Sequence, residues 1–321
     1  GIPSCSETPK RYLAAAIGLA MVAIAVDAAS VGLGPGRPPR EVSMLHEVAR
    51  NDPFFPGEPL LMRGAAKEWP ASQWTLSGMA DTFRGVPASF VSFGCKEEAS
   101  WGEGEEDEEG DVEACSWLEG DAGEFFRTLS QERPGEDYEA GLLVRMLRED
   151  DELLYARPEL IRQLHPASLV PMKDFLRRRY VFEYRLWAGP ANASTGLHAD
   201  LDPGALLVHI GPGKKRLLFL PPSAAEALGA SDGLPGDGGQ YPPGSMNLFS
   251  PTVVDDFPST KALQGFPDLV DVTLAPGDVL YVPCGWFHQV MYLGEPSMSV
   301  TILASHPDEA SLGGMSMDTC R

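Results

Sequence analysis

The stretch Thr195-Gly196-Leu197-His198-Ala199-Asp200 places a histidine and a carboxylate two residues apart in a segment that we predict to be a short strand. Alternate residues of a strand project from the same face of a sheet, so the side chains of His198 and Asp200 point the same way. That arrangement is half of a metal site. A lone His-x-Asp sequence is weak evidence, because a strand histidine is more often a hydrogen-bonded core residue.

A second segment, residues 276–288, supplies the missing ligand. Its sequence, Pro-Gly-Asp-Val-Leu-Tyr-Val-Pro-Cys-Gly-Trp-Phe-His, predicts a turn and a short strand before His288. Two histidines and one aspartate form the facial triad that binds non-haem Fe(II) and leaves three coordination positions open. We therefore predict that His198, Asp200 and His288 are metal ligands and catalytic residues.

Four segments of the chain together resemble a known protein family. They are residues 60–70 (Leu-Leu-Met-Arg-Gly-Ala-Ala-Lys-Glu-Trp-Pro), 186–200, 214–222 and 274–288, and their order and spacing extend the resemblance over residues 42–305. The chain is similar there to the cupin-like, JmjC-type Fe(II)/2-oxoglutarate-dependent oxygenases, in particular the small hydroxylase branch that includes the asparaginyl hydroxylase of hypoxia-inducible factor. The resemblance implies a mainly β fold, the double-stranded β-helix or jelly roll of cupins, with α/β decoration on its N-terminal side. Short strands and Gly/Pro-rich turns after residue 180 favour the same architecture.

The resemblance also implies a cofactor and two co-substrates. Fe(II) would be the metal, and 2-oxoglutarate and O₂ the co-substrates, with oxidation of 2-oxoglutarate to succinate accompanying hydroxylation of a C–H bond. Thr195 and Lys215 match the positions that hold the far carboxylate of 2-oxoglutarate, and Thr301 matches a polar position on the last strand. A carboxylate inside a barrel needs such partners, because an unpaired buried charge is costly.

Strand alternation predicts which side chains point into the barrel. Lys215 shares a face with two apolar residues and is expected to point inward, whereas Lys214 and Arg216 are expected to point toward solvent. His288 and Tyr292 also share a face, so His288 is expected to point inward among apolar companions.

Three departures from the family pattern concern the substrate side of the site. Gly204-Ala205 stands where the family often has an asparagine, His209 stands where it often has a glutamine, and the stretch from Asp200 to Lys215 is slightly longer. For His209, a hydrogen-bonded strand position is favoured over a spare metal ligand. These departures leave the triad intact and affect substrate identity.

The leading functional hypothesis is an Fe(II)- and 2-oxoglutarate-dependent dioxygenase that hydroxylates a protein side chain. The same mechanism could serve N-methyl-lysine demethylation or hydroxylation of an RNA nucleoside. A non-catalytic cupin that binds metal and a partner is the alternative from a different class. The net charge of −21 disfavours nucleic acid, whose phosphates require clustered Lys and Arg, and favours a basic protein or peptide as substrate.

Composition divides the 321 residues into four regions. We expect a targeting segment and linker (1–40), an N-terminal α/β region (41–179), a jelly roll (180–305) and a C-terminal tail (306–321). Within the second region, residues 96–124 are rich in Glu and Asp and are expected to form a disordered insertion. The short tail lacks apolar periodicity, which predicts a monomer.

We make a separate structural prediction for each of two connecting segments in the jelly roll. Strands over residues 206–210 and 215–220 are joined by Gly211-Pro212-Gly213, which predicts a hairpin. Residues 229–245 are rich in Gly, Pro and Asp, and we expect them to border the barrel mouth and to change order when substrate binds.

Residues 10–30 combine two basic residues, an apolar run and small residues, which are the three zones of a signal peptide. The apolar run is shorter than the ~20 residues of a membrane span, so we expect secretory or organellar targeting and no stable span, with a cytoplasmic protein as the alternative. The five cysteines lack Cys-x-x-Cys spacing, so neither a zinc ribbon nor a disulfide framework is indicated. Asn192-Ala193-Ser194 is an N-glycosylation sequon that only a secretory route would use.

Overall fold

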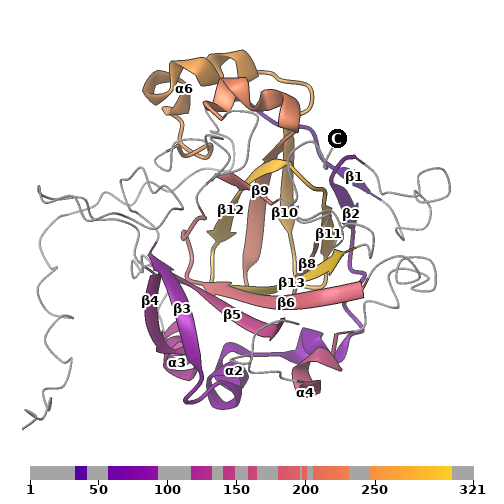
Figure 1. The fold of residues 1–321 in the computed structure, drawn as a ribbon, viewed down its shortest axis with the longest axis vertical. Helices are drawn as coiled ribbons and strands as arrows, with labels where there is room; N and C mark the ends of the chain where they lie inside the picture. The colour runs from indigo at the N-terminus through magenta and orange to yellow at the C-terminus, as the bar shows by residue number, and fades with distance from the viewer. Residues whose placement is uncertain are drawn as a thin grey trace, which may run out of the picture.

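The structure is a computed structural model that describes residues 33–41, 57–92, 117–131, 140–148, 158–164, 180–195, 197–200, 205–230 and 246–305. These residues form two β-sheets that face each other, with helices outside both (Figure 1). The larger sheet has the strand order β1-β2-β11-β8-β13-β6-β5-β3-β4, and the smaller sheet has the order β10-β9-β12-β7. The predicted mainly β jelly roll with N-terminal α/β decoration is confirmed.

The strands are short and almost all antiparallel, the parallel pair of β1 and β2 excepted. Those of the larger sheet are β1 (Arg40–Glu41), β2 (Leu60–Met62), β3 (Pro87–Ser92), β4 (Trp117–Asp121), β5 (Ala140–Arg148), β6 (Tyr180–Gly189), β8 (Ala205–His209), β11 (Val279–Val282) and β13 (Ser297–Ser305). Those of the smaller sheet are β7 (His198–Ala199), β9 (Lys214–Leu220), β10 (Val270–Leu274) and β12 (Phe287–Leu293). The N-terminal strands β3, β4 and β5 therefore extend a sheet of the jelly roll.

Helices cover the outer face of each sheet. On the larger sheet lie α2 (Leu76–Thr82), α3 (Ala122–Gln131) and α4 (Pro158–Ile161), whose apolar residues share one core with the outward residues of β6, β8 and β13. On the smaller sheet lie α6 (Val253–Asp256) and the 3-10 turns Pro222–Ala224, Glu226–Leu228 and Pro258–Leu263 (Figure 1). A third apolar core fills the space between the two sheets.

Strand β9 is buried on both of its faces. Leu217 and Phe219 point inward and belong to the core between the sheets. Leu218 and Leu220 point outward, where they pack in one core with Leu248 and other residues of the segment that follows β9. The second half of the strand, residues 217–220, is therefore a continuous apolar run, as is usual in strands covered on both faces.

Arg216 lies on the outward face of β9, but it is not exposed to solvent. Its Nε and Nη2 atoms donate to both carboxylate oxygens of Asp271 on β10, at 3.0 and 2.7 Å, and its guanidinium lies 5.8 Å from the ring centre of Phe249. The prediction that Arg216 points toward solvent is wrong, because the segment after β9 covers this face. Lys214 is exposed, as predicted.

The predicted hairpin of β8 and β9 is also wrong. Strand β8 pairs with β11 and β13 in the larger sheet, whereas β9 pairs with β10 and β12 in the smaller one. Residues 211–213 therefore carry the chain from one sheet to the other. Gly213 has a φ of +70°, and a Cβ atom there would lie 2.6 Å from the carbonyl oxygen of Glu295, so the crossing requires a glycine.

Part of the predicted acidic insertion is ordered. Residues 117–121 form β4, which pairs with β3, and α3 begins at Ala122, so the prediction of disorder over residues 96–124 is wrong at its C-terminal end. The Asp121 carboxylate accepts hydrogen bonds from the backbone N–H groups of Gly85 and Glu124, and the second of these caps the start of α3. The predictions for residues 1–32, 42–50, 96–116, 231–245 and 306–321 lie outside the described residues. Within the described part of the chain, no helix is long and apolar enough to span a membrane.

Candidate active site

The three predicted metal ligands converge between β7 and β12. His198 and His288 lie opposite each other in the pairing of these strands, and their ring centres are 4.3 Å apart. The Asp200 carboxylate lies 4.0 Å from Nε2 of His198 and 3.7 Å from Nε2 of His288. These separations are too long for hydrogen bonds. One ligand atom from each residue lies within 4.8 Å of the other two, so the group can hold a metal ion.

The loop before β12 orients two of the three ligands. Nδ1 of His288 donates a hydrogen bond to the carbonyl oxygen of Trp286 at 3.0 Å, which leaves the Nε2 lone pair free to bind a metal. The backbone N–H of Gly285 donates to the carbonyl oxygen of Asp200 at 2.8 Å. A single turn between β11 and β12 thus positions both the imidazole and the carboxylate.

The charges of the ligands suit a metal ion. Burial alone would raise the pKa of Asp200, but His288, His198 and Arg185 outweigh it and hold that pKa below its ordinary value. Burial, together with the neighbouring His198, lowers the pKa of His288 to about 4. At neutral pH the site therefore contains an ionised carboxylate and a neutral imidazole of His288, the protonation states that metal binding requires.

Cys284 in the same loop is disulfide-bonded, and its partner lies outside the described residues. The spacing of the five cysteines indicated no disulfide framework, and it gave no sign of this single bond. Gly285 follows Cys284 directly, and Trp286 comes next. The disulfide is therefore attached to the turn that orients Asp200 and His288.

Lys215 points into the barrel, as strand alternation predicted. Its side chain is 2% exposed, and its Nζ donates hydrogen bonds to the hydroxyl oxygens of Tyr292, at 3.2 Å, and of Ser299. Burial lowers the pKa of Lys215 to about 7 and raises that of Tyr292. Among the described residues no carboxylate pairs with this ammonium, so its surroundings suit an anion. The sequence analysis did not identify Ser299, and it treated Tyr292 only as a neighbour of His288. The indication for Tyr292 was that it shares the inward face of its strand with His288.

The two threonines named from the sequence lie in different surroundings. The Oγ1 of Thr195 accepts a hydrogen bond from the backbone N–H of Val290 at 3.1 Å, and the Thr195 N–H donates to the Val290 carbonyl. Because Val290 lies between His288 and Tyr292 on β12, Thr195 lies between the metal group and Lys215. The Oγ1 of Thr301 instead accepts from Nε1 of Trp187 at 3.1 Å.

His209 is a buried histidine outside the metal group, as favoured from the sequence. Its Nε2 donates to the carbonyl oxygen of Gly213 at 3.2 Å, and its Nδ1 has no hydrogen-bond partner among the described residues. Burial, with a contribution from the charge of Lys215, lowers the pKa of His209 to about 4. The ring is therefore neutral at pH 7 and adds no positive charge beside Lys215.

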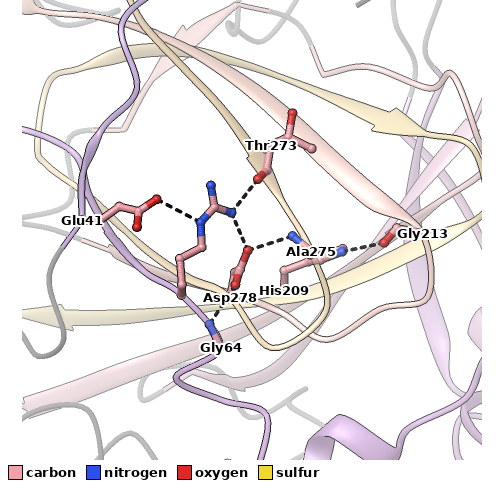
Figure 2. Close-up of polar contacts among 8 residues, drawn as sticks. Glu41, Gly64, His209, Gly213, Thr273, Ala275 and Asp278 are labelled. Carbon is pink, nitrogen blue, oxygen red and sulfur yellow. Dashed lines mark hydrogen bonds and ion pairs between the residues drawn. The ribbon is translucent and has the colours of Figure 1, made fainter.

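Asp278 holds the turn that contacts His209. This role of Asp278 was not predicted from the sequence. Figure 2 shows its buried carboxylate, which accepts from Nη1 of Arg63 at 2.7 Å and from the backbone N–H groups of Gly64 at 2.8 Å and Ala275 at 2.9 Å. The carbonyl oxygen of Asp278 accepts from the backbone N–H of His209 at 2.9 Å. Asp278 thus ties β2 to the turn before β11 and to the end of β8.

With this geometry established, a comparison with protein families gives a match. A family model described as a cupin-like domain matches residues 48–305. The chain belongs to this family of cupin-like domains. The matched residues include both sheets of the jelly roll from β2 onward, and all three residues of the metal group.

Three named proteins are similar to this cupin-like chain. Lysine-specific demethylase JMJ31 of Arabidopsis thaliana is 27% identical over 158 residues, which are 49% of this chain and 26% of the relative. Lysine-specific demethylase JMJ21 of the same plant is 25% identical over 251 residues, 76% of this chain and 23% of the relative. The 2-oxoglutarate and iron-dependent oxygenase JMJD4 of Mus musculus is 34% identical over 149 residues, 43% of this chain and 32% of the relative. The chain thus matches less than two thirds of the length of each.

The residues of the cupin-like domain fit the groups that these names imply. Two imidazoles and one carboxylate are the donor set of non-haem Fe(II) sites with open positions. The buried ammonium of Lys215, with two hydroxyl groups beside it, fits the far carboxylate of 2-oxoglutarate. His288 and Tyr292 lie on one face of β12, four residues or about 13 Å apart along the strand, and the Lys215 side chain extends into the barrel next to Tyr292.

Proposed function

We propose that this cupin-like protein is an Fe(II)- and 2-oxoglutarate-dependent dioxygenase that hydroxylates a side chain of a protein substrate. The observation that supports this most is the arrangement along the inward face of β12. At His288 the strand faces a group of three metal-binding side chains, and at Tyr292 it faces the buried cation of Lys215. The metal group and the Lys215 ammonium face the same interior side of β12, so a small molecule with an acid at each end would lie along this strand between them.

In this proposal His198, Asp200 and His288 hold the metal. Bound there, iron and 2-oxoglutarate supply the oxidation, in which O₂ and 2-oxoglutarate yield succinate, CO₂ and one oxygen atom that enters a substrate C–H bond. The Trp286 carbonyl keeps the His288 imidazole in the orientation in which Nε2 faces the metal. The Gly285 N–H restrains the backbone of Asp200.

The second part of the site binds the far carboxylate of 2-oxoglutarate. Lys215 supplies the charge, and the hydroxyl groups of Tyr292 and Ser299 supply further hydrogen bonds. The hydroxyl oxygen of Thr195 already accepts a hydrogen bond, so its own hydrogen is available to the bound molecule. Phe219, an apolar residue of the core between the sheets, stacks on His288 and helps to exclude water from the reaction.

A protein or peptide is the substrate class that we propose, with a basic sequence favoured by the net charge of −21. Two of the relatives are named lysine-specific demethylases, which makes N-methyl-lysine demethylation the second candidate. Both reactions begin with hydroxylation of a C–H bond, and they differ in whether the product keeps the new oxygen or loses formaldehyde.

The test begins with anaerobic titration of the protein with Fe(II) and then 2-oxoglutarate. Turnover is then measured against a peptide library as succinate formed, with mass spectrometry of the peptides. Gain of one oxygen supports hydroxylation, and loss of a methyl group with release of formaldehyde supports demethylation. The variant His288→Ala should not bind the metal, and it should therefore also lose the binding of 2-oxoglutarate that depends on the metal. It serves as the inactive control. Failure of the unaltered protein to bind Fe(II) would overturn the proposal.

A further inference from the structure

The turn after β6 presents a sequon on the surface of the protein. Of the asparagines in the chain, Asn51, Asn192 and Asn247, only Asn192 has a serine or threonine two residues later with no proline between. Asn192 is exposed and has a φ of +68°, a left-handed conformation that asparagine adopts more readily than most residues. Its side-chain amide has no hydrogen-bond partner among the described residues.

The backbone of this turn is held although the side chain is free. The N–H of Asn192 donates to the carbonyl oxygen of Tyr292 at 2.8 Å, and Ser194 forms an isolated bridge with Met291. Ala193 between them is buried. A group attached to the amide of Asn192 therefore displaces no packed side chain and breaks no hydrogen bond of the fold.

The turn lies at the end of the barrel away from the metal group. It pairs with β12 at Met291 and Tyr292, whereas His198 pairs with His288. Four residues of strand separate the two levels, about 13 Å. A bulky group on Asn192 leaves the surroundings of the metal ligands accessible to a protein substrate.

Two independent features indicate the compartment in which such a group is added. Cys284 is disulfide-bonded, and disulfides persist in oxidising compartments such as the secretory route. Residues 10–30 have the basic, apolar and small-residue zones of a secretory signal. We propose that Asn192 carries an N-linked glycan, acquired as the chain enters the secretory route. This inference is independent of the proposed oxygenase activity.

The modification requires a lipid-linked oligosaccharide pyrophosphate and an oligosaccharyltransferase. The amide nitrogen of Asn192 forms a bond to the anomeric carbon of the oligosaccharide, and the bond from that carbon to the pyrophosphate oxygen breaks. The lipid pyrophosphate leaves, and one amide proton passes to a base of the transferase. The hydroxyl of Ser194 is the second recognition element of the sequon.

The experiment expresses residues 1–321, preceded by an initiator methionine, in insect cells, fused after residue 321 to a reporter domain that carries one sequon known to be glycosylated. The purified protein is treated with peptide-N-glycosidase F, which converts a glycosylated asparagine to aspartate, and is mapped by mass spectrometry. Conversion of Asn192 together with the reporter asparagine is the expected result. A glycosylated reporter with unmodified Asn192 would overturn the site, and an unmodified reporter would overturn the secretory route and with it the proposal.

Matched variants separate loss of the sequon from misfolding. Ser194→Ala should abolish conversion of Asn192, whereas Ser194→Thr, which keeps the hydroxyl, should retain it. Asn247→Gln should leave the modification unchanged, since Asn247 is outside any sequon. Continued modification of Asn192 in Ser194→Ala would contradict recognition of this sequon.

Discussion

The Nζ atom of Lys215 lies 3.2 Å from the hydroxyl oxygen of Tyr292 and 4.3 Å from the centre of its ring. The two residues are direct partners in the pairing of β9 with β12, so the contact is a consequence of strand register. A hydroxyl group and an aromatic face stabilise the ammonium without neutralising it. The charge therefore remains able to bind an acid.

Replacing Lys215 by alanine should weaken 2-oxoglutarate binding strongly and leave metal binding unchanged. Loss of a buried charge-assisted pair costs about 2–5 kcal/mol, which corresponds to roughly 30- to 4,000-fold in affinity. Anaerobic calorimetry with Fe(II) and then 2-oxoglutarate measures both steps. Lys214→Ala is the matched control, because Lys214 is exposed and should change neither affinity. A larger loss in Lys214→Ala than in Lys215→Ala would contradict the assigned pocket.

Binding of 2-oxoglutarate should weaken as the pH rises above about 7. Burial lowers the pKa of Lys215 from its ordinary 10.5 to about 7, so above that pH the free protein loses the charge that the carboxylate needs. Binding must then be accompanied by proton uptake, and affinity should fall by up to roughly tenfold per pH unit. Below pH 7 Lys215 is already charged, and the dependence should flatten. Calorimetry in buffers of different ionisation enthalpy counts the protons, and Lys215→Met should remove the uptake.

Replacing Cys284 by serine should destabilise the protein and loosen the metal group. Removal of a disulfide typically costs about 2–4 kcal/mol of unfolding free energy. Since the adjacent turn orients Asp200 and His288, metal affinity should also fall by roughly 10- to 100-fold, the usual effect of disturbing groups that hold metal ligands. Urea denaturation and Fe(II) titration measure the two effects.

The same experiment identifies the partner of Cys284. Serine variants of Cys5, Cys95, Cys115 and Cys320 can be compared with Cys284→Ser under non-reducing conditions. One of the four should reproduce the loss of stability and of metal affinity, and the other three should resemble the unaltered protein. If Cys284→Ser itself changes neither quantity, the disulfide has no role in positioning the ligands.

Asp271→Ala should cost about 3 kcal/mol of unfolding free energy, the low end for a buried ion pair that loses one partner. The side chains of Arg216 and Asp271 are only 7% and 19% exposed, so the guanidinium would be left with an unpaired charge under Phe249. The double variant Arg216→Leu/Asp271→Leu should recover most of the loss, because no charge remains to be desolvated. Chemical denaturation of the three proteins decides whether the pair is coupled.

The protein should be a monomer in solution. Among the residues whose side chains the structure describes, the outward apolar residues of both sheets pack against helices and turns of the same chain and are not left free for a second copy. Light scattering at micromolar concentration should give the mass of one chain, 34.6 kDa. A stable dimer would contradict this prediction.

Local patterns were sufficient to predict the metal group and the direction of Lys215. Two-residue periodicity places His198 and Asp200 on one face and places His288 and Lys215 on faces that they share with apolar residues, and those apolar neighbours indicated the inward direction. The resemblance to a family supplied the association between these strands. The close approach of the His198 and His288 rings follows from the strand periodicity together with the pairing of strands that the family resemblance implied.

Features that depend on contacts between distant segments could not be predicted in this way. A Gly-Pro-Gly turn between two apolar runs favours a hairpin locally, yet β8 and β9 find their partners in different sheets. Arg216 is covered by a segment that follows it in the chain and is neutralised by Asp271 on β10. The hydrogen bonds of Lys215 to Tyr292 and Ser299 join three strands, and no spacing in the sequence predicts them.

The double burial of β9 limits how the length of this chain can change. Deleting one residue within the strand would turn Arg216 into the barrel and Lys215 out under the helices, and would exchange two sets of apolar residues between two cores. Insertions and deletions should therefore be tolerated only outside the strand, in residues 201–204 or in the segment between β9 and β10. The stretch between Asp200 and Lys215 is slightly longer than in the family pattern, and this extra length can lie before β9 without changing the register of the strand. Homologues that differ in length should keep the β9 register and vary on either side of it.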